Sequence, residues 1–180
     1  TLDGDGDPDL ASLSEVTKRV AVHRNGGQGR FEPPTFEDSE ISSPLPRPLG
    51  LAALDVDGDG DVDLAVGDGH RLGTEIAVLV NDGTGAFPGR MQIPLATQRG
   101  MQELLAADLD GNGLADLVLA GEGPPAVILN LGGGSFSEAV VYSPPVGGTC
   151  CWEPTSVAVG DVTGDGHPDL VGAMGAYLGA

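Results

Sequence analysis

Aromatic and cationic residues are scarce in this sequence. Phe, Trp and Tyr make up 4% of its 180 residues, and eight Lys and Arg stand against 27 Asp and Glu, so that the formal net charge is −19. A chain this acidic is not expected to bind nucleic acid or an anionic membrane surface, because both are negatively charged. With few aromatic side chains, the core has to be built from Val, Leu, Ala and Ile, for which the 40% hydrophobic content is sufficient.

Long apolar runs and common catalytic motifs are also missing. No run approaches the roughly 18–20 apolar residues of a membrane-spanning helix, so we do not expect this segment to insert into a membrane. There is no G-x-S-x-G, no H-E-x-x-H and no convincing Ser-His-Asp set, and we therefore predict no catalytic residues. A pair of carboxylates acting on a glycosidic bond stays open as an alternative. Without an initiating Met or a signal peptide, the sequence is interpreted as a portion of a longer protein.

The sequence has only two cysteines, Cys150 and Cys151, which are adjacent and precede Trp152. Neither a C-x-x-C-H haem motif nor a C-x-x-C zinc pair is present. Neighbouring Cα atoms are about 3.8 Å apart, below the ~4.4–6.8 Å that a disulfide usually spans. Three states stay open: a strained vicinal disulfide, two free thiols, or disulfides to another chain.

What the sequence has in abundance is a nine-residue acidic loop, which occurs four times. Loop I (residues 1–9) reads TLDGDGDPD, loop II (55–63) DVDGDGDVD, loop III (108–116) DLDGNGLAD and loop IV (161–169) DVTGDGHPD. The loops start 54, 53 and 53 residues apart, and each is followed by Leu and a short apolar run. A constant period of this length indicates a repeat architecture.

The loop pattern matches the chemistry of calcium. Oxygen-bearing side chains occupy positions 1, 3, 5 and 9 of every loop, and Ca²⁺ takes six to eight oxygen ligands. Gly at position 6 allows the positive φ of a sharp turn, and position 7, whose side chain varies, would contribute its backbone carbonyl. Without a cation, carboxylates about 4–5 Å apart repel by roughly 3–4 kcal/mol per pair. The alternative is a set of Asp-Gly turns that only face solvent.

Up to four Ca²⁺ ions are therefore predicted, most firmly in loops II and III. The predicted ligands are Asp3, Asp5, Asp7 and Asp9 in loop I, Asp55, Asp57, Asp59, Asp61 and Asp63 in loop II, Asp108, Asp110, Asn112, Leu114 and Asp116 in loop III, and Asp161, Thr163, Asp165, His167 and Asp169 in loop IV. Loops I and IV are weaker because Thr1 and Thr163 replace an Asp. An EF-hand is excluded, because position 12 is never Glu and the flanks lack helix-capping signals.

A Gly-rich turn follows between successive loops. The three turns cover residues 25–31 (NGGQGRF), 81–87 (NDGTGAF) and 130–136 (NLGGGSF), each after an apolar stretch. Asn-x-Gly-x-Gly in this position predicts a hairpin whose Phe returns to the core. The repeat then reads strand, acidic loop, strand, variable loop, strand, Gly-rich turn, strand, which is typical of a β-propeller blade.

On the motifs D-x-D-G-D-G-x-x-D-L and N-x-G-x-G-x-F, the chain resembles the FG-GAP/VCBS repeat family over nearly its whole length. The family's calcium-loop propellers occur in integrin α-subunits and in many secreted bacterial proteins. The resemblance implies an all-β fold, a β-propeller of four-stranded antiparallel blades, with an extracellular or cell-surface location. Three full repeats and part of a fourth (1–48, 49–101, 102–153 and 154–180) suit a portion of a larger propeller of about seven blades. Two chains pairing into one propeller is the alternative.

This topology places the Gly-rich turns on the face of the acidic loops and the variable loops on the opposite face. Binding residues are often drawn from loops held by a rigid scaffold. The candidate ligand-binding residues of the opposite face are Trp152, Cys150, Cys151, His70, Arg71, Arg99 and Met101. Trp152 with the cysteine pair is the first choice, and the structural alternative is that Trp152 caps the gap between two blades.

The function predicted from the sequence is that of an extracellular propeller with structural calcium, used for adhesion, assembly or ligand recognition. Its partner would be a protein, a glycan or a second copy of the chain. One alternative is a glycan-binding, lectin-like propeller, which a glycan array would identify. Another is an accessory or catalytic propeller of a secreted hydrolase, which an activity screen of the full-length protein would address.

Overall fold

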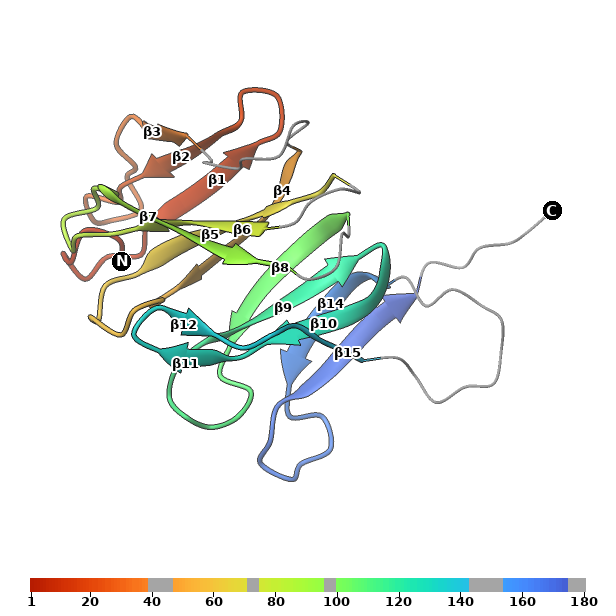
Figure 1. The fold of residues 1–180 in the computed structure, drawn as a ribbon. Coiled ribbons are helices and arrows are strands. Elements are labelled where there is room, and N and C mark those ends of the chain that lie inside the picture. Colours follow the sequence, from red (N-terminus) through yellow and green to blue (C-terminus); the bar gives the residue numbers. More distant parts are fainter. Residues whose placement is uncertain (39–46, 71–74, 96–99, 143–153, 175–180) are drawn as a thin grey trace.

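The computed structural model describes residues 1–38, 47–70, 75–95, 100–142 and 154–174. All regular secondary structure in these ranges is β-strand, and the strands form antiparallel sheets that follow one another along the chain (Figure 1). The predicted all-β architecture is therefore confirmed.

The second sheet shows the complete repeat. Its four strands, in spatial order, are β4 (Pro48–Leu54), β5 (Asp63–Asp68), β6 (Glu75–Val80) and β7 (Gly89–Pro94). Loop II joins β4 to β5, and the second Gly-rich turn joins β6 to β7. The register pairs Leu64 with Ala53 on one side and with Leu79 on the other. The order of strands and turns is the one that the sequence predicts.

The other sheets are variants of the same unit. The first sheet contains β1 (Leu10–Ser14), β2 (Arg19–His23) and β3 (Thr35–Asp38), which correspond to β5, β6 and β7. The third contains β8 (Met101–Ala107), β9 (Asp116–Gly121), β10 (Gly123–Ile128) and β13 (Val140–Val141), and its Gly-rich turn forms a small hairpin of β11 (Asn130–Gly132) and β12 (Ser135–Phe136). The last contains β14 (Pro154–Gly160) and β15 (Asp169–Met174).

The core lies between the sheets, which pack face to face. One apolar cluster joins the first and second sheets, another the second and third, and another the third and last. Strands β5 and β9 are buried along their whole length because a neighbouring sheet covers each face. Their short continuous apolar runs reflect this double burial. Fully burying a side chain such as Leu64 or Leu117 contributes roughly 1.5–3 kcal/mol.

The Phe that ends each Gly-rich turn has three different environments. Phe87 is buried in the cluster between the first two sheets, and Phe136 packs partly against the next cluster. Each thus contacts the sheet that precedes its own. Phe31 is 46% exposed, so the prediction that it returns to the core is wrong. It belongs to the first sheet, whose corresponding face has no other described sheet against it.

The stack of sheets does not close into a ring within the described residues. At its two ends, Leu10 on β1 and Val171 on β15 are 50% and 46% exposed, whereas the corresponding strands of the middle sheets are buried. The fold is that of a partial β-propeller (Figure 1). The total number of blades stays a prediction.

Candidate metal centres

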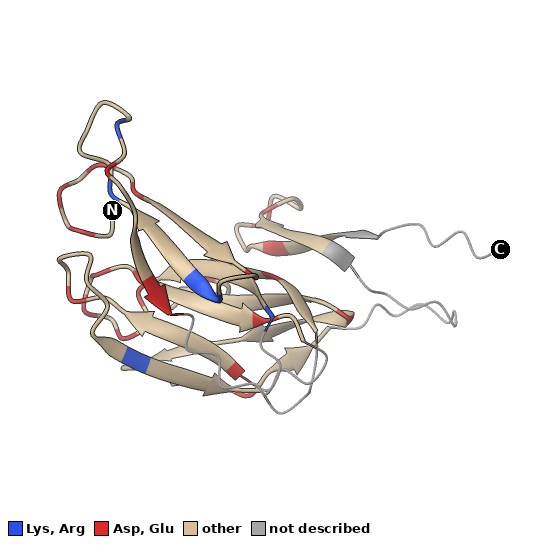
Figure 2. Cartoon of the chain, turned by 90° about the horizontal axis from the view of Figure 1, so that it is seen from above, with Lys and Arg blue, Asp and Glu red and all other residues tan. Residues whose placement is uncertain are grey.

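The four acidic loops share one backbone course. The Gly at position 6 has φ of +93°, +95°, +86° and +88° in loops I to IV, as predicted, and the Gly at position 4 is also left-handed, between +76° and +85°. Loops II, III and IV leave the stack at the same edge, at the lower left in Figure 1. Figure 2 shows Asp and Glu gathered on the loops, whereas Lys and Arg are few. The glycines therefore shape all four loops alike.

The Asp at position 1 caps the turn. In loop II, Asp55 Oδ1 accepts the N–H of Gly58 at 2.7 Å and its Oδ2 accepts the N–H of Gly60 at 2.9 Å. Asp108 makes the same two bonds in loop III at 2.8 and 2.9 Å, and Asp161 makes them in loop IV at 2.6 and 2.9 Å. A carboxylate at this position thus holds the loop in shape before any ion arrives.

The Asp at position 9 fastens the loop to the Gly-rich turn. Asp63 is fully buried, its Oδ2 accepts the N–H of Val56 and its Oδ1 the N–H of Asn81, both at 2.8 Å. Asp116 makes the equivalent bonds at 2.8 and 2.7 Å, and Asp9 at 2.5 and 2.8 Å. The sequence predicts this Asp only as a metal ligand, because the spacing of the residues does not show which main-chain N–H groups lie near its carboxylate.

Loops II and III each bring three carboxylates together. The two triads are Asp55, Asp57 and Asp63 in loop II, and Asp108, Asp110 and Asp116 in loop III. Within each triad, one oxygen from every residue lies within 4.8 Å of the others. Two oxygens that bind one Ca²⁺ at about 2.3–2.6 Å can be at most about 5 Å apart. The donor set therefore fits one hard cation, and the absence of His and Cys from both loops disfavours zinc.

Loops I and IV form no such triad, although all their residues are described. In loop I, the hydroxyl of Thr1 donates to Asp3 and Asp5, both at 3.3 Å, where the other loops have a carboxylate. Arg24 Nε also lies 3.9 Å from Asp3 Oδ2. In loop IV, Thr163 stands at position 3. The predicted ligands of these two loops stay predictions, and the preference for loops II and III agrees with the geometry.

The position 7 side chain lies against the Gly-rich turn. A Cβ on Gly83 would stand 2.6 Å from Asp61 Oδ2, and Gly83 itself has φ of +79°. In loop III, a Cβ on Gly132 of the third turn would stand 3.4 Å from Leu114 Cδ1, which is an ordinary van der Waals contact. The Gly two residues after the Asn therefore turns the chain with its positive φ, and its lack of a side chain leaves room for the position 7 side chain of the loop. Because the position 7 side chain lies against the turn, the backbone carbonyl remains the group that position 7 is predicted to contribute to an ion.

Position 5 differs between the two candidate centres. Asp59 Oδ1 accepts the N–H of Asp61 at 2.9 Å. Asn112 Oδ1 accepts the N–H of Leu114 at 2.7 Å, while its Nδ2 donates to Asp110 Oδ2 at 3.3 Å. Both position 5 side chains thus form hydrogen bonds within their own loops, and Asn112 Nδ2 also donates to the backbone oxygen of Asn130 in the Gly-rich turn at 3.0 Å. Asn112 has a neutral amide where loop II has a charge.

The Asn that opens each Gly-rich turn is a functional residue that sequence reasoning did not single out. Asn25, Asn81 and Asn130 are all buried. Each donates its N–H to the position 9 Asp, and its Oδ1 accepts an N–H within the turn, from Gly27, Gly83 and Gly132 respectively. The recurrence of Asn at the same point of three repeats is the signal that the sequence offers, although by itself it indicates only a turn.

Burial alters the electrostatics of loop II. Burial is the main cause that raises the pKa of Asp63 to about 6, and the charges of Asp57 and Asp59 raise it further. The N–H groups of Asn81 and Val56 act in the opposite direction, because they favour the charged carboxylate. A carboxylate whose pKa is raised among like charges is one that a divalent cation would stabilise in its ionised form.

Most of the predicted ligand-binding residues fall outside the described ranges. These are Trp152, Cys150, Cys151, Arg71 and Arg99. Of the other two, His70 follows β5 and is half-buried, and Met101 begins β8 and is buried. The ligand face therefore stays a prediction.

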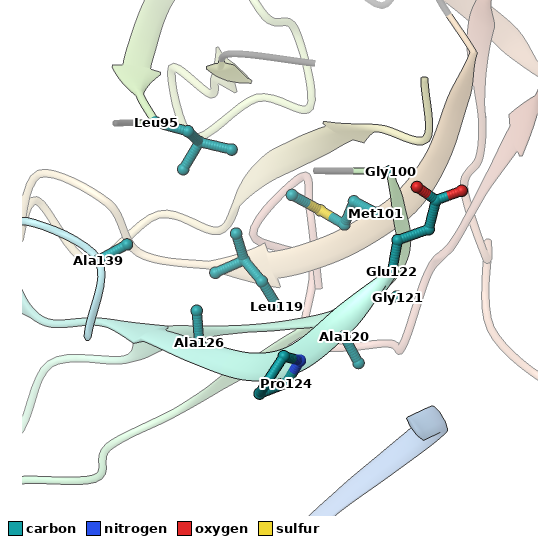
Figure 3. Close-up of a pocket in the computed structure, with 10 residues that line it drawn as sticks. All are labelled: Leu95, Gly100, Met101, Leu119, Ala120, Gly121, Glu122, Pro124, Ala126 and Ala139. Carbon is teal, nitrogen blue, oxygen red and sulfur yellow. The ribbon is translucent and has the colours of Figure 1, made fainter. Parts of the chain in front are cut away.

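An apolar cavity lies beside Met101 on that side of the sheets (Figure 3). Leu95, Leu119 and Ala126 line it, with Glu122 near its edge. Its volume is about 20 Å³, which is enough for about one water molecule and far below the ~300–1,000 Å³ of small-molecule sites. It is not a site for a sugar or a substrate.

Antiparallel sheets stacked as propeller blades, with an acidic loop before β1, β5, β9 and β15, define the class of this protein. The FG-GAP-like repeat model matches residues 2–66, 55–119 and 108–172, and the chain belongs to this family. Each match begins in one acidic loop and ends in the strand after the next loop. No curated protein matches the chain.

Among solved structures, the chain is similar to a chain of the Photorhabdus luminescens Tc holotoxin pore. The identity is 26% and the TM-score 0.57, over 90% of this chain. The chain spans only 8% of that chain's length. The described residues contain no helix capable of crossing a membrane.

Proposed function

We propose that loops II and III bind structural Ca²⁺ and that the protein is an extracellular propeller module for adhesion, assembly or ligand recognition. The observation that carries the proposal is the pair of carboxylate triads, each with oxygens close enough to share one ion. The repeat family supports it, because FG-GAP-like repeats often bind calcium and are typically non-catalytic structural modules.

The position of the triads favours a structural ion. Asp63 and Asp116 hold the N–H groups of a neighbouring turn as well as facing the candidate centre. An ion bound there would neutralise the carboxylates and tie loop, turn and strand together. Several carboxylate and carbonyl oxygens without an octahedral arrangement suit Ca²⁺ better than Mg²⁺, which requires near-ideal octahedral geometry.

An extracellular location suits such sites, because calcium sites of extracellular modules have dissociation constants of about 10⁻⁴–10⁻³ M. Similarity to a chain of a holotoxin pore supports a place within a larger assembly, with the propeller presenting its loops to a protein or glycan partner. Fold alone does not select among such partners.

Calcium titration tests the proposal directly. We expect isothermal titration calorimetry to detect Ca²⁺ binding that EDTA reverses and that Mg²⁺ at equal concentration does not reproduce. Asp57→Ala and Asp110→Ala should each remove one site. Glu32→Gln removes one exposed charge outside the four loops and should leave the isotherm unchanged. If the double variant Asp57→Ala, Asp110→Ala bound as much calcium as the unmodified protein, the assignment to these loops would be wrong.

A further inference from the structure

Asn130, which opens the third Gly-rich turn, lies between the two candidate centres. It is fully buried. Its N–H donates to Asp116 Oδ1 at 2.7 Å, and its carbonyl oxygen accepts from Asn112 Nδ2 at 3.0 Å, so two residues of loop III are attached to it. Its own Nδ2 is directed to the preceding repeat, where it lies 3.5 Å from the backbone oxygen of Asp55 in loop II.

The preceding repeat has a similar bridge with a shorter contact, made to position 2 of the preceding loop where Asn130 reaches position 1. Asn81 donates its N–H to Asp63 Oδ1 in loop II at 2.8 Å, and its Nδ2 donates to the backbone oxygen of Leu2 in loop I at 2.7 Å. The N–H of Leu2 in turn donates to Asp9. The bridge between neighbouring acidic loops is therefore a property of the repeat, and Asn130 is the copy that joins the two loops with triads.

We propose that Asn130 is a positioning residue that couples Ca²⁺ binding at loop II to Ca²⁺ binding at loop III. This inference rests on the proposed function of the two loops. Asp55 and Asp116 belong to different triads, and Asn130 contacts the backbone of the first and the carboxylate of the second.

The coupling follows from ordering. An ion in loop III draws Asp116 towards itself and fixes the turn that begins at Asn130. The amide of Asn130 then restrains the backbone of Asp55, so the ion that enters loop II meets a loop that is already partly ordered. Linkage requires loop II to help loop III by the same factor. Because 3.5 Å is long for a hydrogen bond, we expect a modest factor of about three to ten in affinity.

Two-dimensional ¹⁵N–¹H NMR can follow the loops separately during a CaCl₂ titration of the protein. The amide of Gly60 donates to Asp55 Oδ2 in loop II, and the amide of Gly113 donates to Asp108 Oδ2 in loop III. Both signals should move when their own loop fills. Asp57→Ala removes the loop II site and leaves Gly113 as a reporter of loop III alone.

In the otherwise unmodified protein, Asp57→Ala should move the Gly113 midpoint to about three- to tenfold higher calcium. When Asn130→Ala is also present, Asp57→Ala should no longer move that midpoint. Asn25→Ala is the matched control, because Asn25 opens the equivalent turn but its Nδ2 donates only to Pro8 of its own loop. It should lower the melting temperature in EDTA much as Asn130→Ala does, yet preserve the shift.

The two proposals fail differently. If neither Gly60 nor Gly113 responds to calcium, the proposed function itself is wrong. If both respond but Asp57→Ala leaves the Gly113 midpoint unchanged, calcium binds and the coupling does not exist, a result that needs no Asn130 variant and holds even if Asn130→Ala fails to fold. A shift that persists in Asn130→Ala would overturn the role of Asn130.

Discussion

Loops II and III differ from loops I and IV in side chains and hardly at all in backbone. All four have left-handed Gly residues at positions 4 and 6, yet only loops II and III assemble a carboxylate triad. One Thr in each of the other loops accounts for the difference, at Thr1 and at Thr163. The comparison shows that glycine pattern and turn contacts form the loop, and that the carboxylates decide whether it can hold an ion.

Loop I also has a different source of positive charge. Arg24 immediately precedes the Asn of the first turn, where the second turn has Val80, and its guanidinium donates to the backbone oxygen of Gly85 at 2.7 Å while lying near Asp3. In loop I an arginine therefore supplies part of the charge that loops II and III would obtain from Ca²⁺.

The largest expected effect is the loss of stability on replacing the Asp at position 9, which should far exceed the loss on replacing the Asp at position 3. In EDTA, Asp116→Ala should lower the free energy of unfolding by about 4 kcal/mol, because the buried N–H of Asn130 and the partly buried N–H of Leu109 lose a charged acceptor. Asp110→Ala, in the same triad, loses two exposed hydrogen bonds, both from Asn112, and should cost about 1 kcal/mol. Urea unfolding of both variants measures the difference. Equal destabilisation would show that position 9 has no structural role beyond the metal.

Removal of calcium is expected to have the second-largest effect on stability. At ten times the dissociation constant, each filled site adds about 1.4 kcal/mol, so chelation should remove about 3 kcal/mol for loops II and III together. Thermal melting in CaCl₂ and in EDTA measures this loss. The double variant Asp57→Ala, Asp110→Ala should melt at the same temperature in both solutions. A large calcium response remaining in that variant would mean that loops I and IV also bind.

The pH dependence should differ with and without calcium. Burial raises the pKa of Asp63 in the folded protein to about 6, above the ordinary value of 3.8 for an aspartate. The folded state thus binds the proton more tightly, and in EDTA the stability should fall as pH rises from about 4 to about 6, by on the order of 2–3 kcal/mol, and then level off. With calcium, the ion stabilises the charged form. The gap between the two melting curves should therefore widen over this window, and a constant gap would contradict the expectation.

The smallest expected effect is the conversion of loop I into a third site. Thr1→Asp supplies the missing carboxylate, and Arg24→Val removes the competing charge by copying Val80. Together they should add one Ca²⁺ to the stoichiometry and about 1.4 kcal/mol of calcium-dependent stability at ten times the dissociation constant. Calorimetry and melting measure both quantities.

The single changes serve as controls for this conversion. Thr1→Asp alone should bind the third ion more weakly, because Arg24 still faces Asp3. If Thr1→Asp alone bound as tightly as the double variant, Arg24 would have no part in the difference between loop I and loop II.

The sequence by itself determined the order of strands, acidic loop and Gly-rich turn in the repeat, and the oxygen-bearing side chains of each loop. Alternating oxygen side chains around a fixed Gly predicted loops that can hold a hard cation, because ligand spacing and positive φ are local properties. The apolar runs between loops and turns predicted short strands, and the constant period predicted stacked sheets. Even the preference for loops II and III followed from single residues, Thr1 and Thr163.

Only the tertiary structure decided which segments that are distant in the sequence contact each other. That Asp63 and Asp116 accept N–H groups from a neighbouring turn, that Asn130 faces both its own loop and Asp55 of the preceding one, and that Phe31 is exposed where Phe87 is buried all depend on segments distant in sequence. Repeats that share the same motifs acquire different roles because burial is set by the sheet packed alongside, and the local sequence does not show which sheet that is.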